Sequence, residues 1–199
     1  MLTPFRAAAD RIIFDVANLR YLLGQLTPAG LDARSAATGW TVKETVAHLA
    51  EAEERHAAGL ESLLKGGTLR PPGYDRDAAN AESVARHRAT APEELIAIYG
   101  AARDRTIAAL RRFTSNAAVP GFEGVRLGTV VAGWAAHPAS HMLDELEAAP
   151  ELLTDGLILN WALVPTGEAS PEWLARRNAL LDEAQRRIDA LEKTTNTKE

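Results

Sequence analysis

The amino-acid sequence predicts an all-α protein, a four-helix bundle with an extra C-terminal helical tail. Hydrophobic residues make up 46% of the 199 residues, and Ala, Leu, Glu and Arg, all strong helix formers, are abundant. Four long segments repeat apolar side chains at the spacing of an amphipathic helix. The sequence shows neither strand alternation nor an internal repeat, so a bundle is the architecture that these segments favour.

Local signals indicate where the helices of the bundle begin and end. The expected helices span residues 5–26, 41–64, 92–113 and 127–148. Thr41 stands three residues before Glu44, which is the spacing of a capping box at the start of the second helix. Pro92 favours the start of the third helix, and Pro150 ends the fourth. A further short helix is expected over residues 79–88.

The chain is expected to divide into two parts. Residues 1–150 form the bundle, and residues 151–199 form a helical extension. This extension has an apolar piece over 157–165, a helix over 171–191 and a disordered end over 193–199. It carries more apolar surface than a solvated appendage tolerates. It therefore packs on the bundle or on a second subunit, and we expect a homodimer with two-fold symmetry.

Charge and composition narrow the classes of function. A net charge of −5 gives no support for binding the phosphates of nucleic acid. The N-terminal segment lacks the charged-then-apolar order of a signal peptide, and no apolar run reaches the ~18 residues of a membrane span. We therefore expect a cytoplasmic protein that binds neither nucleic acid nor membrane. Because the chain has no cysteine, any metal must be held by His, Asp or Glu.

Three histidines stand where two helices can bring them together. His137 and His141 are four residues apart, so they share one face of the fourth helix, within its apolar stripe. His48 lies at the edge of the apolar stripe of the second helix. Two interpretations stay open: a metal site with three nitrogen ligands, or hydrogen-bonded histidines with a structural role. Pro138 separates the paired histidines and predicts a kink in the fourth helix.

The start of the second helix resembles a known family. Residues 39–53, Gly-Trp-Thr-Val-Lys-Glu-Thr-Val-Ala-His-Leu-Ala-Glu-Ala-Glu, are similar to the second helix of the DinB-like superfamily, which also includes the maleylpyruvate isomerase N-terminal type proteins. The resemblance covers roughly residues 5–148. It implies a four-helix bundle with a divalent metal held by three histidines, one on the second helix and a spaced pair on the fourth. His48, His137 and His141 occupy those positions.

Such a ligand set determines what chemistry is expected. Three neutral imidazoles leave a divalent metal with open positions, where the pKa of a bound water or thiol falls. Nickel and zinc are the first candidates, since imidazole suits both. The resemblance implies a transferase that depends on a low-molecular-weight thiol, or a metal-dependent hydrolase, acting on a small-molecule substrate. The alternative is a non-catalytic bundle whose site is vestigial or only binds a ligand.

Two glutamates near His48 are candidate catalytic residues. Glu44 lies four residues before the histidine on the same helix face, and Glu51 lies three residues after it. Either side chain is a candidate to orient an imidazole or to act as a base. The competing interpretation is a solvated glutamate at the edge of a helix, which is common.

Glu53 is unusual because its position falls inside the apolar stripe of the second helix. A buried carboxylate needs a partner, and Arg103, Arg105 or the metal site are the candidates. The remaining histidines, His56 and His87, are expected to be solvated or structural.

Overall fold

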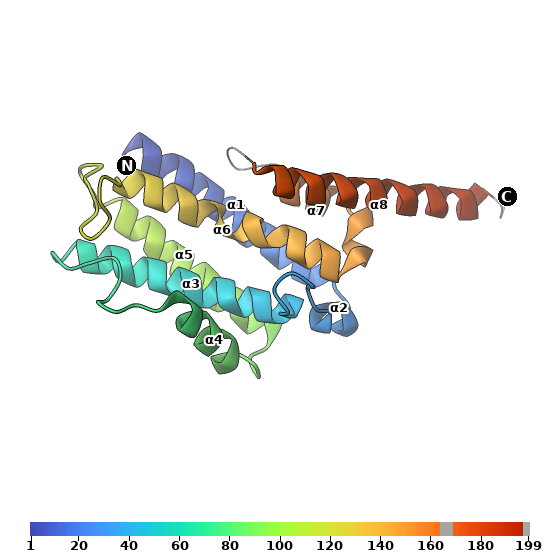
Figure 1. The fold of residues 1–199 in the computed structure, drawn as a ribbon, viewed down its shortest axis with the longest axis horizontal. Coiled ribbons are helices and arrows are strands. Elements are labelled where there is room, and N and C mark those ends of the chain that lie inside the picture. Colours follow the sequence, from blue (N-terminus) through green and yellow to red (C-terminus); the bar gives the residue numbers. More distant parts are fainter. Residues whose placement is uncertain (164–168, 197–199) are drawn as a thin grey trace. The chain divides into compact units, whose positions relative to one another are not determined.

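The computed structural model describes residues 1–163 and 169–196, and it is all-α, with 73% of these residues in helices (Figure 1). Within these residues the only β pairing is two isolated bridges. No described helix combines the length and the hydropathy needed to cross a membrane. In chain order the helices are α1 (Thr3–Gln25), α2 (Pro28–Asp32), α3 (Val42–Leu63), α4 (Arg76–Arg86), α5 (Pro92–Leu110), α6 (Leu127–Ala148), the 3-10 helix η1 (Pro150–Thr154), α7 (Gly156–Ala162) and α8 (Pro171–Asn196).

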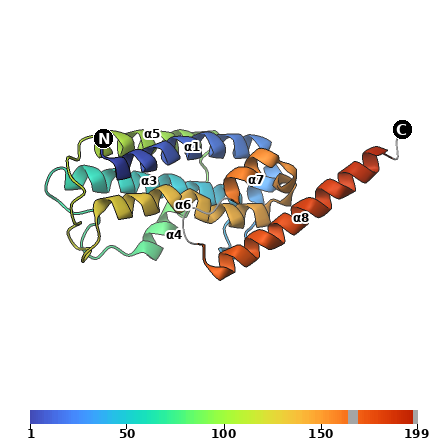
Figure 2. The same ribbon diagram turned by 90° about the horizontal axis from the view of Figure 1, so that it is seen from above.

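One compact unit, residues 1–20 and 43–138, is a four-helix bundle. In it α1, α3, α5 and the first half of α6 lie side by side (Figures 1 and 2). Burial of apolar side chains between these helices is the main stabilising term of such a bundle. The buried core cluster contains Phe5, Ala8, Ala9, Ile12, Leu60, Leu69, Ile107, Ala109, Leu110, Val119, Leu127, Val131 and Ala135.

The second compact unit contains residues 21–42 and 139–199. Here η1 contacts both α7 and α8. The guanidinium of Arg177 on α8 donates a hydrogen bond of 2.8 Å to the carbonyl of Leu163, just after α7. Trp161 is only 3% exposed, as expected for a tryptophan in an apolar segment. The tail is therefore a folded part of the chain with a hydrogen-bonded packing of its own.

Several helix boundaries agree with the local chemistry of the sequence. The helix α6 begins and ends at the predicted residues, and α5 begins at Pro92 as predicted. The helix α4 begins at Arg76, earlier than expected. The reason is Asp75, whose carboxylate accepts hydrogen bonds from two backbone N–H groups of the first turn.

The structure also corrects parts of the sequence-based prediction. The short elements α2 and η1 were not predicted, because five residues are too few to show a helical period. The disorder expected from residue 193 onward is wrong for residues 193–196, since α8 continues to Asn196. Thr194 and Thr195 donate hydrogen bonds to the carbonyl of Leu191 near this helix end. Residues 164, 165 and 197–199, which the predictions also covered, lie outside the described residues.

Candidate metal centre

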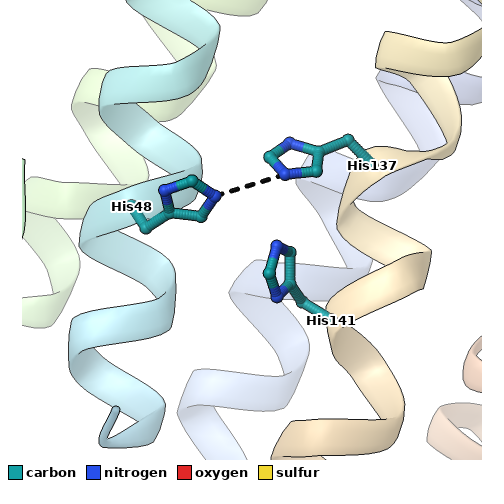
Figure 3. A group of neighbouring side chains, drawn as sticks. All are labelled: His48, His137 and His141. Atoms are coloured by element: carbon teal, nitrogen blue, oxygen red, sulfur yellow. Dashed lines mark hydrogen bonds between the residues drawn. The ribbon is translucent and has the colours of Figure 1, made fainter. Parts of the chain in front are cut away.

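His48 on α3 lies opposite His137 and His141 on α6 (Figure 3). One ring nitrogen of each histidine lies within 4.8 Å of the corresponding nitrogens of the other two. His48 is 4% exposed, and His137 and His141 are half-buried. The structure therefore brings together the three histidines that the sequence identified as candidate ligands.

The spacing of the imidazoles suits a metal ion. The Nε2 atoms of His48 and His137 are 3.2 Å apart, and the two rings are nearly perpendicular, at 84°. Two ligands bound to one tetrahedral ion at ~2.1 Å stand roughly 3.4 Å apart. The same 3.2 Å also fits a hydrogen bond between neutral imidazoles, with one ring donating to the other. The spacing of His48 and His137 therefore fits either a hydrogen bond between the two rings or two ligands of one metal ion.

The backbone of α6 explains how the paired histidines reach one site. The helix is continuous from Leu127 to Ala148, with Pro138 inside it. Positions four residues apart lie one turn apart on the same face of a continuous helix. The proline therefore does not separate His137 from His141, although it removes a backbone donor from the helix. The kink at this residue stays a prediction.

Asp144, which sequence reasoning missed, lies behind His141. Its Oδ2 is 3.5 Å from the Nδ1 of His141, which is an ion-pair contact and not a hydrogen bond, and its Oδ1 accepts a 2.6 Å hydrogen bond from Arg176 on α8. Burial opposes ionisation of this carboxyl, but the contacts with His141 and Arg176 outweigh it and lower the pKa of Asp144. A carboxylate against the second nitrogen of a histidine is a common support for a metal ligand. The signal in the sequence was an aspartate three residues after the histidine.

Glu145 is a second residue that the sequence did not reveal. It follows His141 by one helical turn and is 1% exposed. Neither of its carboxyl oxygens has a hydrogen-bond partner among the described residues. Burial, and then the neighbouring charge of Asp144, raise the pKa of Glu145 well above its ordinary value. Glu145 is therefore a buried acid whose neutral form is favoured, one helical turn after His141 on α6.

Glu53 has the partner that its position demanded. It forms an ion pair of 3.3 Å with Arg103 on α5, and both side chains are 2% exposed. Thr106 and His56 also contact the carboxylate, at 2.6 and 3.0 Å. Burial alone would raise the pKa of Glu53, but Arg103 and these hydrogen bonds outweigh it and lower the pKa. Of the three predicted candidates, Arg103 is the partner, whereas Arg105 pairs with two half-buried glutamates of α3, Glu54 and Glu61.

His56 lies beside the three-histidine group without belonging to it. Its ring stacks on Trp134, with centroids 4.1 Å apart and an interplanar angle of 10°. The centroid of its ring is 6.2 Å from that of His137. Burial lowers the pKa of His56, although Glu53 favours the protonated ring. Of the two alternatives expected for His56, solvated or structural, the contact with Glu53 and the stack on Trp134 favour the structural one.

The candidate catalytic glutamates occupy different surroundings. Glu51 accepts hydrogen bonds from Arg86 and His87, at 3.0 and 2.9 Å, on the side of α3 that α4 covers. This contact gives His87 the structural role predicted for it. Glu44 is half-buried one turn before His48. A catalytic role for Glu44 or Glu51 stays a prediction.

Fold and site together define a class: a helical bundle with three histidines converging from two of its helices. Comparison with known families supports the same class. The family model of the DinB superfamily matches residues 14–144. The chain belongs to the DinB superfamily, and the matched residues include His48, His137 and His141. Searches of curated proteins and of solved structures found no match.

Proposed function

We propose that this protein is a metal-dependent enzyme that acts on a small molecule. One observation carries the proposal: His48, His137 and His141 place three ring nitrogens within 4.8 Å of one another. Buried histidines that serve only the fold need no such convergence, because one hydrogen-bond partner each would satisfy them. The donor set, three imidazoles without a thiolate, suits nickel or zinc.

The proposed reactions follow from this donor set. When bound, a divalent ion held by three neutral imidazoles supplies open positions that favour the ionised form of a water or a thiol. We propose thiol-dependent transfer with a low-molecular-weight thiol, or hydrolysis, as the reaction class. The residues of the chain hold the ligands in place: Asp144 behind His141, and the stack of His56 on Trp134 beside His137.

The proposal predicts that the purified protein, after loading with zinc or nickel and removal of free ion, retains about one ion per chain. His48→Ala should lose the ion, because two remaining imidazoles hold it much more weakly. His87→Ala is the matched control, since this half-buried histidine contacts Glu51 of α3 but lies outside the three-histidine group. Elemental mass spectrometry measures the ion content.

A different result would favour the second candidate, a non-catalytic bundle. The hydrogen-bonding distance between His48 and His137 favours this alternative, because it satisfies both rings without an ion. If the parent protein retains no ion and His48→Ala behaves like the parent, the site is vestigial or binds only an organic ligand.

We also propose that the protein is a cytoplasmic homodimer. Support comes from the tail, where Leu157 is 67% exposed and Leu191 is 56% exposed, together with Leu174 and Leu181 at 38% and 37%. Pairing of two copies about a two-fold axis would cover such leucines.

Light scattering should therefore give twice the chain mass for the full-length protein. Leu191→Glu, at an exposed position of α8, should shift the equilibrium toward the monomer, because it places a charge on the apolar surface. Lys193→Glu is the control for the added charge on the same helix. A full-length protein that is monomeric at all concentrations would contradict the dimer.

A further inference from the structure

Arg176 connects the C-terminal tail with the helix that carries two of the candidate ligands. It lies on α8, outside the residues matched by the family model. Its guanidinium donates a hydrogen bond of 2.6 Å to Asp144 Oδ1 and two hydrogen bonds of 2.9 Å to the carboxylate of Glu147. Both acids are on α6. A planar guanidinium that binds a carboxylate through two nitrogens fixes the geometry of the contact.

Asp144 stands between Arg176 and His141. One carboxylate oxygen accepts from the arginine, and the other lies 3.5 Å from His141 Nδ1. The side chain of Asp144 is 8% exposed, so water offers it few alternative partners. With Nδ1 of His141 facing this carboxylate, Nε2 is the nitrogen left for an ion. The orientation of His141 therefore depends on the contact between Asp144 and Arg176 of the tail.

We propose that α8 is part of the candidate metal centre, with Arg176 as a positioning residue that holds Asp144, which in turn holds the ring of His141. The inference rests on the proposed function, because it requires an ion at the three-histidine group. Carboxylates that support a ligating histidine typically contribute about 10- to 100-fold to metal affinity. A residue that only orients such a carboxylate should contribute at the lower end of this range.

The first test measures the zinc affinity of the full chain by competition with a chelating dye. Arg176→Ala should weaken zinc binding about tenfold. Arg176→Lys should recover part of the loss, since lysine keeps the positive charge but cannot bind a carboxylate through two nitrogens as a guanidinium does. Arg187→Ala is the matched control. That arginine is on the same helix and similarly exposed, at 39% against 36%, but its ion pair is with Glu183 of its own helix. Its zinc affinity should stay within about twofold of the parent.

A second measurement keeps the proposal testable if Arg176→Ala loses helix content in circular dichroism. Asp144→Asn leaves α8 unchanged in sequence and should weaken zinc binding about 10- to 100-fold. Glu147→Gln is the comparison variant and should weaken zinc binding less than Asp144→Asn, because Glu147 contacts Arg176 and would act on His141 only through it. Hydrogen exchange adds a readout of coupling: zinc should slow exchange in the first turns of α8 in the parent and less so in Arg176→Ala.

The outcomes separate this inference from the proposed function. If the parent binds no zinc, the proposed function is wrong and the inference falls with it. If the parent binds zinc but Arg176→Ala and Asp144→Asn match the control Arg187→Ala, only the inference is overturned. Weakened binding in both variants, with partial recovery in Arg176→Lys, supports it.

Discussion

Replacing Arg103 with methionine is expected to destabilise the protein by about 3–5 kcal/mol, because the change leaves the carboxylate of Glu53 buried without its counter-ion. Arg103 is 2% exposed, and its guanidinium also stacks 4.7 Å from the ring centroid of Tyr99. The expected loss of stability therefore has two causes: the unpaired charge of Glu53 and the lost packing of Arg103 on Tyr99. Urea unfolding followed by circular dichroism measures the free energy of unfolding.

The control for this prediction lies two residues away on α5. Arg105 is 41% exposed and pairs with Glu54 and Glu61 of α3. Arg105→Met should cost less than about 1 kcal/mol, because exposed ion pairs are screened by solvent. Equal losses in both variants would show that the buried pair with Glu53 has no special role in stability.

The pH dependence of Arg103→Met gives a second signature. In the parent, the lowered pKa of Glu53 contributes stability above the unfolded pKa of about 4.3, and this contribution is lost as the pH falls through the folded pKa. In the variant, burial acts on Glu53 without the compensating charge, so the protonated carboxyl is favoured. The difference in stability between parent and variant should therefore narrow as the pH falls from the raised folded pKa of Glu53 in the variant, above about 4.3, to its lowered folded pKa in the parent.

Glu145→Gln should become more stable relative to the parent as the pH rises. Because the pKa of Glu145 is raised in the folded protein, its favourable contribution is complete below about pH 4.3 and declines as the pH rises toward the folded pKa. Over that interval the slope is about 1.4 kcal/mol per pH unit. Glutamine cannot ionise, so the variant lacks this decline.

Urea unfolding of parent and variant across pH 5 to 8 tests this prediction. Glu192→Gln, at an exposed position of α8, is the control and should keep the slope of the parent. The buried amide of Glu145→Gln adds a constant cost of about 1–3 kcal/mol, which shifts the curve without changing its slope. Parallel curves for the parent and Glu145→Gln would mean that Glu145 titrates normally in the folded state.

The sequence was sufficient to predict those features that repeat along one helix. The apolar period and the stop at Pro150 predicted the bounds of α6, and the i, i+4 spacing placed His137 and His141 on one face. The resemblance of residues 39–53 to a family helix then supplied the pairing with His48. Glu53 was recognised as needing a partner because it interrupts an apolar stripe. Apart from the pairing with His48, which came from the family resemblance, these features are local in sequence.

Contacts between distant segments were beyond sequence reasoning. Arg176 and Asp144 are separated by 32 residues, and no periodic signal links an arginine of the tail to an aspartate of α6. The sequence left three candidate partners for Glu53, because a helical wheel gives the face on which a side chain lies but not its neighbour on another helix. Arg103 is the partner in the structure, and it lies near the middle of α5.

The short distance between His48 and His137 also has a consequence for ion selectivity. Their Nε2 atoms are already 3.2 Å apart in the folded chain, so folding has restricted the rotamers of both rings before any ion arrives. Preorganised ligands bind with a smaller loss of conformational entropy, and they penalise ions whose bond lengths require a wider spacing. Calcium prefers oxygen ligands at 2.3–2.6 Å. Both the nitrogen ligands and the close spacing of this site therefore disfavour calcium. At the proposed metal centre, this spacing of the two rings would therefore favour small ions with an affinity for imidazole.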